Sequence, residues 1–157
     1  MNTFTANWAF SESYMSEIKK ILRNNAVHIV RIDVADADDD LKHSTDLKVK
    51  ITSGNVAVRI RRAHQHYRDF TVRAKNGNAK TEITKLREGY ADWYLYLWTN
   101  ERGICDWILI DLAKMRDTGL LNDDRPVKIN KDGYTGFCVY GIDEIIRVGA
   151  LIARFEK

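Results

Sequence analysis

The stretch from residue 46 to residue 62 reads DLKVKITSGNVAVRIRR and contains the clearest structural signal in the chain. Apolar and polar residues alternate in its first part, and the alternation resumes after Ser53-Gly54-Asn55. Such alternation is typical of a strand with one buried face, and a short glycine-containing break between two such runs is typical of a hairpin. We therefore predict a β-hairpin with strands at residues 46–52 and 56–62.

The same criteria, applied outward from this hairpin, predict the other elements. Apolar residues at helical spacing predict helices at 11–24, from Thr81 onward, at 112–117 and at 143–148. Branched and aromatic runs predict strands at 26–34, 67–74, 93–99, 104–112, 127–130 and 135–140. The expected fold class is α/β (α+β), with a mixed central β-sheet flanked by helices and an added C-terminal β-hairpin and short helix.

Composition sets the broad class of protein. The chain has 157 residues, of which 45% are hydrophobic and 30% charged, with a single proline. This balance predicts one folded domain over residues 1–157 rather than a disordered chain. The two cysteines form no disulfide framework, and the sequence contains no apolar run of bilayer length and no signal peptide, so we expect a cytoplasmic protein with no membrane partner.

Charge is distributed unevenly although the net charge is only +3. Residues 59–75 hold six basic residues and one acidic residue, a local balance of +5, whereas residues 33–40 hold five carboxylates and no base. The planar guanidinium of arginine binds phosphate in a bidentate manner. We expect Arg59, Arg61 and Arg73 to bind nucleic acid, with DNA as the expected partner. The alternative is that the arginines pair with the acidic segment on an exposed sheet face.

Three carboxylates stand at the ends of predicted elements or within them: Asp46, Asp69 and Glu82. Phosphodiester cleavage with Mg²⁺ or Mn²⁺ needs oxygen ligands that converge on the cation and a group that assists the attacking water. We expect these three residues to be the metal ligands and catalytic residues, with Lys85, one helical turn from Glu82, assisting the water. Each has a structural alternative, such as a favourable charge in the first helical turn for Glu82 or a cross-strand ion pair for Asp69.

The order of elements resembles a known nuclease family. A helix, a strand, the strand bearing Asp46, the strand bearing Arg59-Ile60-Arg61, a helix and a strand resemble the core of the PD-(D/E)XK superfamily, the restriction-endonuclease-like fold. The resemblance covers about residues 11–99. It implies an aspartate on the second strand, represented by Asp46, and often a glutamate on the first helix, for which Glu12 or Glu17 is available. The small size also resembles that of phage-encoded accessory proteins.

The chain departs from the family pattern on the third strand. The family has an acidic residue, any residue and lysine there, but this chain has Arg59-Ile60-Arg61. Divergent members of such folds relocate the missing groups to the following helix, where this chain carries Glu82 and Lys85. The resemblance therefore implies either a metal-dependent nuclease with a rebuilt site or an inactive relative that only binds DNA.

Aromatic residues gather in the predicted strand pair 93–99 and 104–112. Tyr90, Trp93, Tyr94, Tyr96, Trp98 and Trp107 are candidates for stacking unpaired bases. Alternation places Trp93 and Leu95 on one face and Tyr94, Tyr96 and Trp98 on the other, so at least one set is expected in the core or in a dimer interface. The alternative function is thus a non-enzymatic protein-interaction factor, for instance one whose aromatic strand pair forms a homodimer or blocks a partner.

Overall fold

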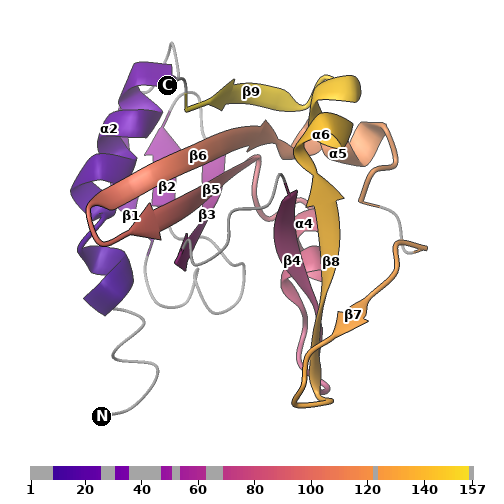
Figure 1. Cartoon of the computed structure of the whole chain (residues 1–157). Helices are drawn as coiled ribbons and strands as arrows, with labels where there is room; N and C mark the ends of the chain where they lie inside the picture. Colours follow the sequence, from indigo (N-terminus) through magenta and orange to yellow (C-terminus); the bar gives the residue numbers. More distant parts are fainter. Residues whose placement is uncertain are drawn as a thin grey trace.

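The computed structural model describes residues 9–25, 31–35, 47–50, 54–62, 69–121 and 124–155. They form a mixed α+β fold with two sheets, shown in Figure 1. The six-stranded sheet contains, in spatial order, β1 (Arg31–Val34), β2 (Leu47–Lys50), β3 (Gly54–Arg62), β5 (Trp93–Asn100), β6 (Gly103–Asp111) and β9 (Leu151–Arg154). The three-stranded sheet contains β4 (Asp69–Asn76), β8 (Thr135–Gly141) and β7 (Lys128–Ile129). The helices are α2 (Met15–Asn25), α4 (Glu82–Arg87), α5 (Leu112–Asp117) and α6 (Ile142–Arg147).

The six-stranded sheet is mixed because β3 and β5 run parallel while its other neighbouring strands are antiparallel. Parallel neighbours need a crossover connection. Here the connection leaves the sheet, forms β4 and α4, and returns as β5. The predicted mixed sheet with flanking helices is confirmed, and the crossover brings β4 opposite β3.

Two apolar cores lie on opposite faces of this sheet. On one face, α2 buries Ile18 and Leu22 against a cluster that includes Leu95 and Leu97. On the other face, the three-stranded sheet and the short helices bury a cluster that includes Tyr94, Tyr96, Trp98, Phe70 and Tyr140. Successive side chains of β5 therefore alternate between the two cores, as the sequence predicts.

Most predicted elements are confirmed, with shifts at their ends. The cap of α4 is Thr81, whose hydroxyl accepts a hydrogen bond from the Thr84 N–H, as expected. A turn at residues 13–14 interrupts the first helix, and there the Ser13 hydroxyl donates to the Phe10 carbonyl, 2.7 Å away; α2 begins after this turn, at Met15. The part of the predicted strand 26–34 that precedes residue 31 lies outside the described residues.

The structure differs from the prediction at two strands. The predicted strand 67–74 appears as β4 but lies in a second sheet, where it pairs antiparallel with β8. A strand after residue 148 is absent from the prediction, yet β9 pairs with β6 at the end of the large sheet. The first difference concerns pairing, because alternation along one strand does not specify its partner, and the second is a strand of only four residues, which carries little local signal.

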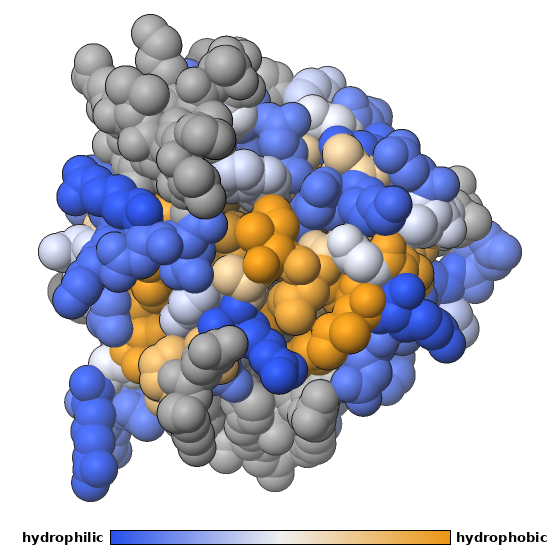
Figure 2. Space-filling view, turned by 90° about the horizontal axis from the view of Figure 1, so that it is seen from above, coloured by the Kyte–Doolittle hydropathy of each residue, from blue (hydrophilic) through white to orange (hydrophobic). Residues whose placement is uncertain are grey.

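Apolar side chains reach the surface at the end of the molecule where β9 and α6 lie (Figure 2). Ile146 of α6 is 44% exposed and Ile152 of β9 is 40% exposed. Among the helices that the structure describes, none is long and apolar enough to cross a membrane.

Candidate functional site

The predicted nucleic-acid-binding arginines come together at one pocket between the two sheets. Arg59 and Arg61 of β3 and Arg73 of β4 line a pocket of about 260 Å³. The pocket's other described lining residues are Thr71, Asn130, Thr135, Gly136 and Phe137. The alternation of β3 explains the placement, because Val58 and Ile60 pack in the core on the α2 face while Arg59 and Arg61, at the alternate positions, face the second sheet. We call this the arginine pocket.

Side chains of β5 and α4 accept hydrogen bonds from the edge of β4 that faces away from β8. β4 pairs with β8 on one side only, so the N–H groups on its other side need different acceptors. The Thr71 N–H donates to the Tyr96 hydroxyl at 3.4 Å, and the Arg73 N–H donates to Glu82 Oε2 at 2.9 Å. These bonds fix β4, and with it Arg73, opposite β3.

Arg61 is held in place by the same residues. Its Nε donates to the Tyr96 hydroxyl at 2.9 Å, and one of its terminal nitrogens donates to the Thr71 hydroxyl. Two of its N–H donors are thereby engaged, and the guanidinium lines the pocket. The ring of Tyr96 lies in the core, so a rigid part of the sheet orients this arginine.

Glu82 is the carboxylate beside the arginine pocket. Its Oε1 accepts from the Tyr94 hydroxyl at 2.7 Å, its Oε2 accepts from the Arg73 N–H, and Oε2 lies 3.6 Å from a terminal nitrogen of Arg59. The side chain is 12% exposed. Burial raises the pKa of Tyr94 well above its usual range and the charge of Glu82 raises it further, so the hydroxyl stays protonated and donates.

The described residues do not assemble the predicted metal site. Asp69 begins β4, four residues before Arg73, which separates it from the Glu82 contact by roughly 13 Å along the strand. Lys85 is buried on α4, and Asp46 lies outside the described residues. In the part of the chain that the structure describes, no group of three or more histidine, cysteine or acidic residues is placed to hold a metal ion. The oxygens of Glu82 face an O–H, an N–H and a guanidinium, so a cation bound by Glu82 would have to displace these contacts.

The carboxylates expected on the first helix lie away from the arginine pocket. Glu17 lines a different pocket, between α2 and the residues Ile104 and Trp107 of β6. Glu12 is exposed. Neither carboxylate is among the described lining residues of the arginine pocket.

Four of the predicted stacking residues are core residues, whereas Tyr90 and Trp93 are half-buried. Tyr94, Tyr96 and Trp98 are at most 4% exposed, and Trp107 is 8% exposed. Both strands also have neighbours on both sides, since β5 lies between β3 and β6, and β6 between β5 and β9. Burial within the chain removes these rings as a surface for stacking bases and as a homodimer interface.

Sequence reasoning missed the polar residues from the C-terminal hairpin. Asn130 and Thr135 line the arginine pocket, and the Asn130 amide donates to the Thr135 hydroxyl at 2.7 Å. Asp132 fixes this turn by accepting from the Thr135 N–H and hydroxyl, which together lower its pKa. The local sequence predicts the turn, but only the pairing of β4 with β8 brings it to the arginines.

The arginine pocket is rich in positive charge, which is chemistry that suits an anion. Three guanidinium groups and the side-chain amide of Asn130 supply donors, and Glu82 is the carboxylate that pairs with one arginine. A comparison of this chain with models of known protein families and with curated protein sequences finds no match.

Proposed function

We propose that the protein binds the phosphate backbone of nucleic acid, with DNA as the expected ligand, through Arg59, Arg61 and Arg73. The observation that supports this most is that arginines from two separate sheets line one pocket. Planar guanidinium groups that share a pocket suit the tetrahedral oxygens of phosphate. The tie of Arg61 to Tyr96 supports the proposal further, because a preorganised side chain loses less conformational entropy on binding.

We further propose that the large sheet is a divergent restriction-endonuclease-like core. The helix α2 precedes three antiparallel strands, and β5 follows a crossover and runs parallel to β3. This element order is the one on which the resemblance rests. In this interpretation, β4 is an insertion in the crossover, and the insertion brings Arg73 to Arg59 and Arg61.

Binding is tested by fluorescence anisotropy with labelled DNA at low salt and without metal. Arg59→Gln, Arg61→Gln and Arg73→Gln are each expected to weaken binding about tenfold and to reduce the salt dependence by about one phosphate contact. Arg147→Gln removes the same charge at an exposed position of α6 that is not among the described lining residues of the pocket, and it serves as the control. Absence of binding at low salt, or an equal loss in Arg147→Gln, would contradict the proposal and favour the protein-interaction alternative.

Metal-dependent cleavage is the second candidate function. The supporting observation is that Glu82, from the helix after β3, lies 3.6 Å from Arg59, the first residue of the tripeptide that occupies the family's acidic-x-Lys position. The test is a nuclease assay with Mg²⁺ or Mn²⁺ on duplex, branched and single-stranded DNA. Cleavage that is lost in Asp46→Ala would support catalysis. No cleavage by the wild-type protein, or undiminished cleavage by Asp46→Ala, would leave a protein that only binds.

A further inference from the structure

A groove continues from the arginine pocket along β3 toward α2. A second pocket of about 430 Å³ shares Arg59, Arg61 and Arg73 with the arginine pocket and is also lined by Phe10 and Arg62. A third pocket of about 580 Å³ shares Phe10 and Arg62 with the second. The shared residues show that the second pocket adjoins both the arginine pocket and the third pocket. Basic residues therefore follow the groove from β4 to the beginning of α2.

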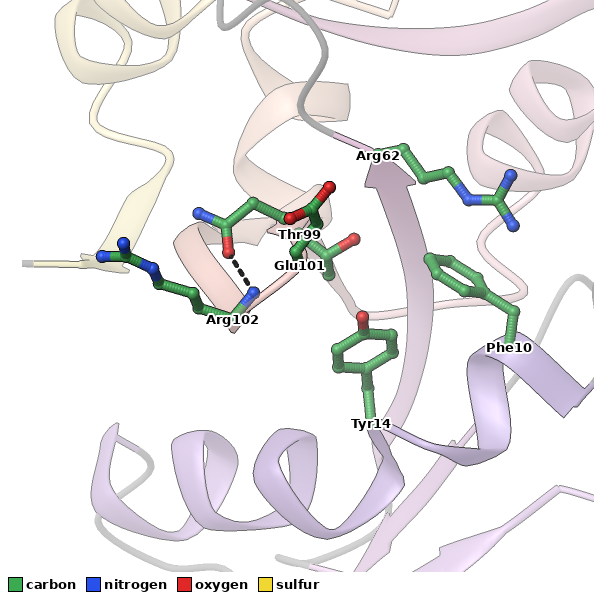
Figure 3. A pocket seen from close by; sticks show the side chains of 7 residues that line it. Phe10, Tyr14, Arg62, Thr99, Glu101 and Arg102 are labelled. Atoms are coloured by element: carbon green, nitrogen blue, oxygen red, sulfur yellow. Dashed lines mark hydrogen bonds between the residues drawn. The ribbon is translucent and has the colours of Figure 1, made fainter.

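The third pocket, shown in Figure 3, combines aromatic rings with polar groups. Phe10 and Tyr14 meet edge to face with their ring centroids 5.2 Å apart. The guanidinium of Arg62 lies over the Phe10 ring, 4.7 Å from its centroid. Thr99, Asn100, Glu101 and Arg102, at the β5–β6 turn, complete the described lining. We call this the aromatic pocket.

The turn side of the aromatic pocket is structurally fixed. The Asn100 side-chain carbonyl accepts a hydrogen bond from the Arg102 N–H at 2.8 Å, the bond drawn dashed in Figure 3. Thr99 is 2% exposed, and its hydroxyl donates to the Arg61 carbonyl at 3.3 Å. This bond links the turn directly to the strand that carries the arginines. The aromatic pocket is therefore held in a defined position relative to the arginine pocket.

These features match one class of ligand. A nucleobase has a flat face that stacks on aromatic rings and on guanidinium groups, and polar edges that hydrogen-bond to amide, hydroxyl and carboxylate groups. Its backbone carries phosphates at regular intervals, for which the arginines of the groove are suited. Proteins that bind single strands combine a positively charged groove with aromatic side chains on which bases stack.

We propose that the aromatic pocket binds an unpaired base of single-stranded nucleic acid whose phosphates lie at the arginine pocket. This inference rests on the proposed phosphate-binding function and specifies its ligand. Duplex DNA does not satisfy the groove in the same way, because its bases are stacked on one another and are not free to enter a pocket. The protein thus prefers a single strand to a duplex.

The test compares three fluorescein-labelled ligands of equal length by anisotropy: a single-stranded oligothymidine, a duplex and an abasic single strand. The oligothymidine is expected to bind about tenfold more tightly than the abasic strand, because the abasic strand has the same phosphates but no bases to stack. Weaker binding of the duplex than of the oligothymidine is also expected. Because this arm uses the wild-type protein, it does not depend on whether any variant folds.

Single substitutions then test which residue the base contacts. Phe10→Leu keeps the apolar bulk but removes the ring, and it is expected to weaken oligothymidine binding about fivefold or more while leaving binding of the abasic strand unchanged. Phe155→Leu is the matched control, because it makes the same change at a 39% exposed ring that is not among the described lining residues of the groove. Circular dichroism checks that each variant is folded.

Failure of this inference differs from failure of the proposed function. Binding of all three ligands with equal affinity, together with no effect of Phe10→Leu, would overturn the base pocket and leave phosphate binding in place. Absence of binding to any ligand at low salt would overturn both.

Discussion

The space between the two sheets has an apolar end and an arginine end. At the apolar end, Phe70 of β4 packs against Tyr94, Tyr96 and Tyr140, with ring centroids 5.3 to 5.9 Å apart. At the arginine end, the next residue along β4, Thr71, contacts Arg61. Because successive side chains of a strand point to opposite faces, these two neighbours contribute one to the packed core and the other to the polar pocket. The comparison shows that the elements that stabilise the fold also position the groups proposed to bind phosphate.

Tyr96 belongs to both ends. Its ring is 2% exposed and packs against Phe70 and Trp98, whereas its hydroxyl accepts from Arg61 Nε. Glu82 has a similar position, because it accepts from the buried Tyr94 hydroxyl and pairs with Arg59. These two residues connect stability to the proposed site, so they are where the two ends of the space are expected to depend on each other.

The largest effect on the free energy of unfolding is expected from a substitution at the apolar end. Phe70→Ala should lower the free energy of unfolding by about 3–5 kcal/mol, because it removes a buried ring and leaves a cavity among three tyrosines. Denaturant unfolding measures this loss. The control is Phe155→Ala, at a side chain that is 39% exposed, where about 1 kcal/mol or less is expected. A loss in Phe70→Ala no larger than in the control would show that the apolar end is not the main source of stability.

Removal of the Glu82 carboxylate should have the next largest effect on the free energy of unfolding. Glu82→Ala leaves the buried Tyr94 hydroxyl and the Arg73 N–H without their acceptor, which is expected to cost about 2–3 kcal/mol of unfolding free energy. Glu88→Ala, at a carboxylate whose side chain is 41% exposed and pairs with Lys80, should cost less than about 1 kcal/mol. Equal losses in the two variants, measured by denaturant unfolding, would argue against Glu82 as the junction of the two ends.

Alkaline pH should weaken the apolar end. Burial raises the pKa of Tyr140 to about 12, above its ordinary value of 10.0. Because the folded pKa is raised, the stabilisation is fully present below pH 10.0 and is lost as the pH rises toward about 12, on the order of 2 kcal/mol in all. Tyr140→Phe should flatten this dependence.

The same variant tests the packing of Tyr140 at neutral pH. Among the buried side-chain groups that the structure describes, the Tyr140 hydroxyl is the one without a hydrogen-bond partner. Its removal should therefore leave stability unchanged or raise it by up to about 1 kcal/mol. A large loss in Tyr140→Phe at pH 7, or an unchanged alkaline slope, would contradict this description of the apolar end.

The smallest effect on stability is expected at the arginine end. Arg61→Gln should cost about 1 kcal/mol of unfolding free energy, since Thr71 and Tyr96 keep each other as neighbours at 3.3 Å between their hydroxyl oxygens. DNA affinity should nevertheless fall about tenfold. Parallel denaturant and anisotropy measurements on one preparation check the two values. A stability loss as large as that of Phe70→Ala would mean that the arginine end is part of the core.

The sequence predicts the elements of this fold well because each has a local signal. Alternation identifies β3 and the β5–β6 pair, and Thr81 identifies the beginning of α4. The arginine cluster was also predictable, because charge density is a property of the sequence itself. These predictions use only neighbours along the chain, where propensity and pattern carry the information.

The rest of the site depends on contacts between distant segments. β4 pairs with β8, and this pairing brings Thr135 to the arginines. The base-stacking role predicted for the strand-pair aromatics was wrong for the buried rings, because alternation shows that a strand has two faces but not that both are covered. Phe10, near the first helix, gave no comparable signal, and its contacts with Tyr14 and Arg62 are visible only in the structure.

The pairing of β4 with β8 also has a kinetic consequence. Its partners, such as Phe70 and Tyr140, are far apart along the chain, and contacts of large sequence separation form slowly because a long loop must close first. The hairpin of β5 and β6 closes through a short turn and forms early in comparison. The arginine pocket, with one wall on β3 and the other on the three-stranded sheet, is therefore completed late in folding. A nascent chain that has not yet synthesised residues 135–141 has all three arginines but not the pocket that they line.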